Sequence, residues 1–177
     1  FILYDAIGIF CVATIKQSNE QVKQTFVSAI VPHLIQHWSE YPDDDKAICN
    51  LTECFIDIFG SCGPSLQSYA KTVFDRCLRI IDTNLVLFAS GYKDSDLILP
   101  PLNLLSVMSE LFKNSIEELI RSSNLFGLIF RCLKENSRIR QEAFALLGDL
   151  CPYCMAHITP VLNVYIPEII SSIAPHP

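Results

Sequence analysis

The tetrapeptide Cys151-Pro152-Tyr153-Cys154 places two cysteines at the spacing that thiol–disulfide oxidoreductases use. In such an enzyme the motif follows an early β-strand and opens a helix, with most of the fold still to come. Here only 23 of the 177 residues follow Cys154, and no strand pattern precedes Cys151. We therefore interpret Pro152 as the end of a helix. A thiol oxidoreductase acting through Cys151 and Cys154 is kept as a remote alternative.

Two further patterns could bind a metal ion. Cys151, Cys154 and His157 supply three potential zinc ligands, but no fourth ligand lies at a convincing spacing. His33 and His37 lie four residues apart on one predicted helix, without a carboxylate at a matching spacing. The sequence also has neither a glycine-rich phosphate loop nor a serine nucleophile elbow. We predict no catalytic residues, no metal, no cofactor and no enzymatic activity.

Composition narrows the class of partner. Half of the residues are apolar and 18% are charged, which predicts a folded chain with a large interior. The uncharged stretch near the start, 6–15, has ten residues, whereas a membrane span needs about 20. A formal net charge of −6 argues against nucleic acid and favours basic partners. The eight cysteines lie inside apolar helical patterns, so we expect reduced thiols in the core.

Apolar residues recur at helical spacing along the whole chain, with almost no strand-like alternation. The predicted helices span 1–17, 18–38, 45–60, 65–88, 97–113, 115–134, 137–151 and 156–174, and 89–96 is the most loop-like segment. Short and long helices alternate in pairs. Polar residues of the short helices, Asp5, Glu53, Asn103 and Asp149, follow one another at steps of 48, 50 and 46 residues.

A two-helix unit of this length is typical of HEAT and armadillo repeats. The sequence therefore predicts an all-α HEAT-repeat solenoid of about four helix pairs, which buries one continuous core. We expect a single domain, 1–177, excised from a longer protein because the chain opens at Phe1 without an initiator methionine. Its predicted units are 1–17 (second helix of a cut repeat), 18–61, 65–113, 115–154 and 156–174 (first helix of a cut repeat).

Equivalent positions in a solenoid line up along one face, which is the concave face if the short helices are internal. Asp5, Glu53, Asn103 and Asp149 would then form a polar row that attracts an extended basic peptide. The alternative is that these side chains are solvated acids on exposed helix faces without a partner.

Six short stretches then resemble, in the same order, stretches of one protein family. They are "LYDAIG" (3–8), "PHLIQHW" (32–38), "LTECF" (51–55), "VFDRCLRII" (73–81), "RSSNLFGLIFRCL" (121–133) and "RQEAFALLGDL" (140–150). The family is the transportins, nuclear import receptors of the importin-β superfamily that are built of HEAT repeats. The resemblance covers essentially the whole chain, is weakest over 82–100, and is to an internal segment of the C-terminal half.

The resemblance implies a function. Transportins bind cargo proteins through basic, extended proline–tyrosine nuclear localisation signals on the concave face, and the GTPase Ran releases the cargo in the nucleus. Asp5, Glu53 and Asp149 match family positions where acids of the inner helices meet basic signal residues. The family further implies shuttling between cytoplasm and nucleus, no direct nucleic-acid or membrane binding, and sites for Ran and nucleoporins that lie outside this segment.

The chain departs from the family at two positions. Val12 and Asn103 stand where transportins often carry acids, so the preference for basic signals is expected to differ. The cargo-gripping tryptophans of the family are expected before and after this segment, and Trp38, on an outer helix, is interpreted as a packing residue. The second hypothesis for function is a HEAT-repeat scaffold that binds a folded protein partner.

Overall fold

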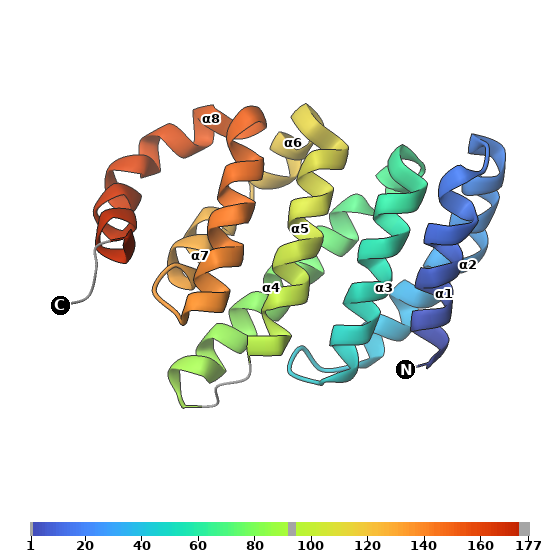
Figure 1. Ribbon diagram of the computed structural model, residues 1–177, viewed down its shortest axis with the longest axis horizontal. Coiled ribbons are helices and arrows are strands. Elements are labelled where there is room, and N and C mark those ends of the chain that lie inside the picture. The colour runs from blue at the N-terminus through green and yellow to red at the C-terminus, as the bar shows by residue number, and fades with distance from the viewer. Residues whose placement is uncertain (1, 92–94, 174–177) are drawn as a thin grey trace.

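The computed structural model describes residues 2–91 and 95–173, and every regular element in those ranges is helical (Figure 1). The α-helices are α1 (Ile2–Ala13), α2 (Glu20–Glu40), α3 (Ala47–Cys62), α4 (Ala70–Ala89), α5 (Leu99–Phe112), α6 (Ile116–Arg121), α7 (Leu125–Cys132) and α8 (Ser137–Ile173). Short 3₁₀ helices join them: η1 (Ile15–Gln17), η2 (Gly63–Tyr69), η3 (Ser95–Leu97) and η4 (Lys113–Ser115).

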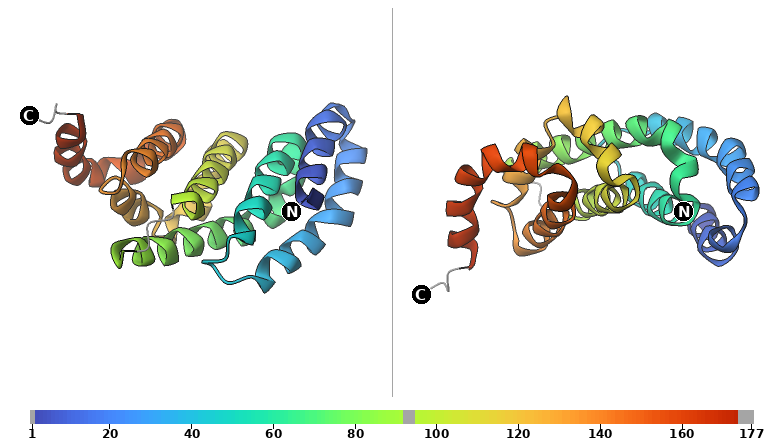
Figure 2. Two further views of the ribbon diagram at one scale, coloured as in Figure 1. Left: turned by 60° about the horizontal axis from the view of Figure 1, so that its bottom comes forward. Right: turned by 90° about the horizontal axis from the view of Figure 1, so that it is seen from above.

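The helices form two layers. The helices α1, α3, α5 and the first half of α8 lie side by side in one layer, while α2, α4 and α7 lie behind them (Figure 1). The stack is curved, and the first layer is on its inner side (Figure 2). This all-α stack of helix pairs confirms the predicted fold class. The predicted division into repeat units stays a prediction.

The register between α3 and α5 follows from their pattern of buried residues. Both helices show the same order of buried and exposed positions at a step of 50 residues. Phe55 and Ile58 of α3 are buried, as are Leu105 and Met108 of α5. A buried stripe at helical spacing fixes which face of each helix turns outward. Glu53 and Asn103 are consequently exposed at equivalent places.

Local capping explains where the helices begin and end. The side chain of Asn19 accepts a hydrogen bond from the Val22 amide at 3.0 Å, so α2 begins at Glu20 rather than at residue 18. The Asp45 carboxylate accepts a hydrogen bond from the Ala47 amide at 2.8 Å just before α3. Gly63, with a φ of 60°, ends α3 in a conformation that side chains rarely adopt.

Four predicted helices differ from the structure. The predicted helix 115–134 is divided, because α6 ends at Arg121 and the Ser123 hydroxyl turns back to the Ile120 carbonyl at 2.9 Å. The start of the predicted helix 65–88 is the 3₁₀ helix η2. The last two predicted helices are joined as α8, which kinks at Cys154 (φ −129°, ψ 23°), two residues after Pro152. Residues 92–94 of the predicted loop and residue 174 lie outside the described residues.

Trp38 is a packing residue, as predicted. Its side chain is buried on α2, with its ring centroid 4.8 Å from that of Phe55 on α3. The guanidinium of Arg76, on α4, lies 5.8 Å from the same ring. Its Nη2 group also donates hydrogen bonds to the carbonyls of Trp38 at 3.3 Å and Tyr41 at 2.7 Å. This cluster fixes α2 and α4 against α3.

One stretch of α8, Ser137–Pro167, is long and apolar enough to cross a membrane, with a mean hydropathy of 1.2 in its most apolar window. Core helices of soluble proteins pass the same test of length and composition. Within this stretch Ile139, Ala143, Leu146 and Leu150 are buried in the core of the stack. The stretch also contains the Cys154 kink. Length and apolar composition therefore do not identify a membrane span here.

Candidate functional site

The Cys151–Cys154 pair lies inside α8, at the kink, rather than at the start of a helix. Cys154 is buried, and burial raises the pKa of its thiol to about 11, with smaller contributions from Glu117 and Cys151. Cys154 is therefore a poor nucleophile at neutral pH, and neither cysteine lies at the start of a helix, where such enzymes place the pair. All eight cysteines are free thiols. The arrangement does not support the oxidoreductase alternative.

Two of the histidines considered as metal ligands, His37 and His157, contact other side chains. Nδ1 of His37 is hydrogen-bonded to the Tyr4 hydroxyl, and Nε2 lies 3.9 Å from the Glu40 carboxylate. Nε2 of His157 lies 3.0 Å from Glu117 of α6. Among residues 2–91 and 95–173, no three His, Cys, Asp or Glu side chains are placed to hold a metal ion.

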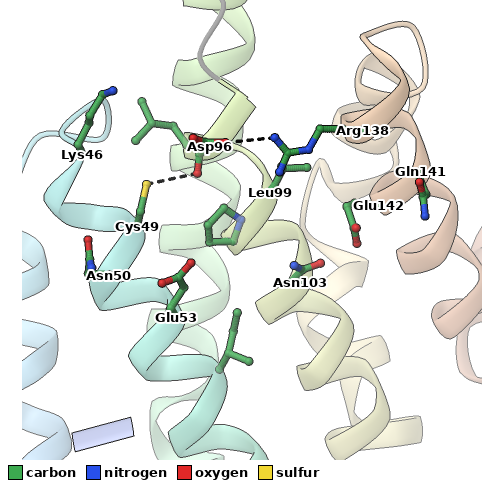
Figure 3. Close-up of a pocket in the computed structure, with 13 residues that line it drawn as sticks. Lys46, Cys49, Asn50, Glu53, Asp96, Leu99, Asn103, Arg138, Gln141 and Glu142 are labelled. Atoms are coloured by element: carbon green, nitrogen blue, oxygen red, sulfur yellow. Dashed lines mark hydrogen bonds and ion pairs between the residues drawn. The ribbon is translucent and has the colours of Figure 1, made fainter. Parts of the chain in front are cut away.

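A cavity of about 620 Å³ opens on the inner layer between α3, α5 and the start of α8 (Figure 3). We call it the inner-face pocket. Its apolar lining comes from Ile56, Leu97, Leu99 and Pro100. Its polar lining comes from Lys46, Cys49, Asn50, Glu53, Asp96, Asn103, Arg138, Gln141 and Glu142. A cavity with an apolar base and several converging polar groups is the usual form of a binding site.

The α1 side of the pocket is acidic. Burial raises the pKa of Glu53, and the negative charges of Asp5, Asp57 and Asp96 raise it further. Burial also raises the pKa of Asp57. The Glu53 and Asp57 carboxylates are therefore disfavoured as anions, and a cation placed beside them would offset the repulsion and the lost solvation. This arrangement favours a positively charged ligand.

One edge of the pocket is formed by the turn η3. The Cys49 thiol donates a hydrogen bond to the Asp96 carbonyl at 3.3 Å, and Nη1 of Arg138 lies 3.5 Å from the Asp96 carboxylate (Figure 3). Asp96 thus contacts both α3 and α8 across the N-terminal end of α5. These contacts hold together the helices that carry Glu53 and Glu142.

The structure brings together part of the predicted polar row. Glu53 and Asn103 line the pocket, and Asp5 lies close enough to Glu53 to raise its pKa. Asp149 does not line the pocket; it accepts a hydrogen bond from Ser106, one turn further along α5. On α8 the residue that lines the pocket is Glu142, which the sequence analysis did not name, and the role of Asp149 in binding stays a prediction. Glu142 precedes Asp149 by seven residues, two helical turns on the same face, and this spacing was the available signal.

Val12, which stands on α1 where the family resemblance suggested an acid, is 46% exposed. It places an apolar side chain on the surface of α1, while the charged residue of that helix, Asp5, lies two turns earlier. The negative potential expected to favour cations thus depends on Asp5, Glu53, Asp57 and Glu142.

No protein-family model matches the chain. Human Transportin-1 is 30% identical to it over 183 residues, an alignment that covers 98% of this chain and 20% of that protein. The chain is a homologue of one segment of the transportins. Transportin-1 of Oryza sativa subsp. japonica is 32% identical over 171 residues, with 93% of this chain and 19% of that protein covered.

The similarity extends to fungal transportin relatives. Importin subunit beta-2 of Schizosaccharomyces pombe is 26% identical over 179 residues, with 96% of this chain and 19% of that protein covered. The chain spans about a fifth of the length of the curated relatives it matches. The resemblance stated from the sequence is therefore confirmed, and it applies to one transportin segment.

Proposed function

We propose that this chain is the cargo-binding segment of a nuclear import receptor, and that its inner face binds extended, basic nuclear localisation signals of the proline–tyrosine type. The observation that carries the proposal is the homology to transportins over 98% of the chain. The acidic inner-face pocket supports it, because carboxylates at Glu53 and Glu142 can pair with lysine and arginine side chains.

The strength of such pairs limits what each residue contributes. An exposed ion pair stabilises a complex by only about 0–1 kcal/mol. Asp5, Glu53, Asp149 and Glu142 would therefore act together, with the amide Asn103 contributing a hydrogen bond rather than a charge. The proposed binding is weak for the isolated segment and depends strongly on salt, since ions at 0.1 M screen the attraction between exposed charges over about 10 Å.

In the longer receptor, Ran-dependent release of cargo and contacts with nucleoporins belong to the same proposal and are assigned to repeats outside this segment. The receptor would shuttle between cytoplasm and nucleus. The proposed activity is binding alone, without catalysis, cofactor, nucleic acid or membrane.

The test measures fluorescence anisotropy of a labelled peptide that carries a basic proline–tyrosine signal. The wild-type chain is titrated at low and at high salt, beside the double variant Asp5→Lys/Asp149→Lys. We expect the double variant to lose most of the affinity at low salt and little at high salt. The matched control is Asp44→Lys/Glu118→Lys, which makes the same change of charge at exposed positions outside the predicted polar row.

Equal binding by the wild type and the Asp5→Lys/Asp149→Lys variant at low salt would contradict the proposed role of the inner acids. An equal loss in the control pair would mean that only net charge matters. A peptide in which glutamine replaces lysine and arginine separates charge recognition from recognition of the rest of the signal.

A further inference from the structure

Three side-chain amides line the inner-face pocket in addition to its acids. Asn50 belongs to α3, Asn103 to α5 and Gln141 to α8, so each of three successive inner helices contributes one (Figure 3). Asn50 is half-buried and the other two are exposed. Within the described ranges, none of the three side chains makes a hydrogen bond or an ion pair. Their donors and acceptors are therefore available to a ligand.

The chemistry of a carboxamide matches that of a peptide unit. Each Asn or Gln side chain carries one acceptor oxygen and an NH₂ group with two donors. Each main-chain peptide presents one N–H donor and one C=O acceptor. A single carboxamide can therefore bond to both groups of a ligand's main chain, and this contact does not depend on the ligand's side chains.

The spacing of the helices selects the conformation of the ligand. Axes of packed helices lie about 8–10 Å apart. A polyproline II segment has three residues per turn and rises about 3.1 Å per residue, so it presents the same face about every 9.3 Å. A β-strand turns the same face every second residue, at about 6.6 Å, which does not fit this spacing. A polyproline II segment would meet one carboxamide per turn.

We propose that Asn50, Asn103 and Gln141 bind the main chain of an extended, polyproline II-like segment laid across α3, α5 and α8. This inference rests on the proposed function and adds to it a part of the recognition that does not involve charge. The amides fix the path of the ligand across the helices. Glu53 and Glu142 lie two helices apart, so they select basic residues about six positions apart along the ligand. Chains that are disordered when free suit this mode, since they already populate this conformation.

The test uses a labelled peptide of about 12 residues, long enough to cross three helices with flanks, rich in proline and alanine and with two lysines about six positions apart. Affinity is measured for the 177-residue chain and for the variants Asn50→Ala, Asn103→Ala and Gln141→Ala. We expect each variant to bind about 2- to 10-fold more weakly, the usual size of one lost hydrogen bond. This loss should persist at high salt. Asn114→Ala and Gln36→Ala, exposed amides outside the pocket, are the controls.

A scan of the peptide backbone tests the main-chain contact directly. Each central peptide bond is replaced in turn by an ester, which removes one N–H and keeps the side chains. We expect weaker binding for peptides with an ester at every third bond. One of these esters should face Asn103, and it should cause no further loss of affinity when it is tested against the Asn103→Ala variant. The inference would be overturned if the loss of affinity caused by that ester and the loss caused by Asn103→Ala added fully when the two were combined.

The outcomes also separate this inference from the proposed function. Unchanged affinity in all three amide variants, together with loss in Asp5→Lys/Asp149→Lys, would overturn the main-chain contact alone. Loss in the amide variants with no effect of the charge reversal would support the main-chain contact and contradict the role of the acids. Failure of the wild-type chain to bind either peptide would overturn both.

Discussion

Gly8 of α1 lies directly against the carboxylate of Asp57 on α3: a Cβ atom added to Gly8 would fall 2.3 Å from Oδ2 of Asp57. The two helices can approach this closely because Gly8 has no side chain. The same contact keeps the Asp57 carboxylate in the partly buried position that raises its pKa.

The first prediction concerns this contact. Alanine favours a helix over glycine by about 1 kcal/mol, but here it would displace the Asp57 carboxylate. We expect Gly8→Ala to stabilise the chain by about 1 kcal/mol more in an Asp57→Ala background than in the wild type. Urea unfolding of the wild type, the two single variants and the double variant measures this coupling. Equal effects of Gly8→Ala in both backgrounds would show that the carboxylate moves aside without cost.

The second prediction concerns pH. The pKa of Glu53 lies above its ordinary value of 4.5 because of burial and the neighbouring acids, so the folded chain holds this proton more tightly than the unfolded chain. Its contribution to stability should therefore increase as pH falls through the raised pKa towards 4.5. Affinity for a basic peptide should change in the opposite direction, because protonation removes the negative charge.

Glu53→Gln is the variant that checks this prediction. It should flatten the dependence of both quantities on pH, as measured by urea unfolding and fluorescence anisotropy. A wild-type affinity that increases on mild acidification would contradict the assigned role of Glu53.

The third prediction concerns the ion pair between Arg76 and Asp43, whose Nη1 and Oδ1 atoms lie 2.9 Å apart with side chains 11% and 20% exposed. Arg76→Met would leave the largely buried Asp43 carboxylate with only the longer, more exposed contact to Arg79. Breaking such a pair from one side costs about 3–5 kcal/mol, so we expect a large fall in the free energy of unfolding.

Arg79→Met is the matched control, since Arg79 is 62% exposed and its Nε lies 3.7 Å from the same carboxylate. It should cost about 0–1 kcal/mol. Adding Asp43→Asn to Arg76→Met should recover part of the loss, and an unchanged loss would mean that packing on Trp38 dominates.

The fourth prediction concerns thiol reactivity. Cys49 and Cys151 are half-buried, whereas the other six cysteines are buried. Burial raises the pKa of Cys11, Cys54 and Cys132 to about 12 and that of Cys62 and Cys154 to about 11. It raises the pKa of Cys77 as well. Alkylation followed by mass spectrometry should therefore modify Cys49 and Cys151 first.

A peptide bound in the inner-face pocket should protect Cys49, which lines it, and leave Cys151 as an internal reference. Equal protection of both thiols, or of neither, would contradict the placement of the ligand in this pocket.

Helices and their pairing were predictable from the sequence because apolar residues repeat at helical spacing. The structure places α3 at Ala47–Cys62, two residues from the predicted 45–60. Breaks were harder to predict. The segment "RSSN" (121–124) carries no glycine or proline, and the turn there depends on the local hydrogen bond of Ser123. Pro152 did mark an interruption, but α8 continues as a kinked helix rather than ending.

The equivalent placement of Glu53 and Asn103 on neighbouring helices could be predicted from the sequence, whereas the binding role of the polar row stays a prediction. The 50-residue step between Glu53 and Asn103 matches the burial of α3 and α5. The following 46-residue step selected Asp149, whereas Glu142 lies at the pocket. A step along the sequence gives the position within a repeat only when loop lengths are equal. Here the position of α8 along the axis of α5 decides which turn of α8 faces Asn103. That position depends on side-chain packing between the two helices.

The contacts of Asp96 affect how the stack of helices can bend. Its carbonyl is bonded to Cys49 and its carboxylate is paired with Arg138, so the short turn η3 braces α3 against α8. A solenoid bends by small rotations between neighbouring repeats, and a brace across three helices makes bending stiffer at that point. Changes of curvature should therefore concentrate on either side of the pocket, and a bound segment would meet a fixed spacing there.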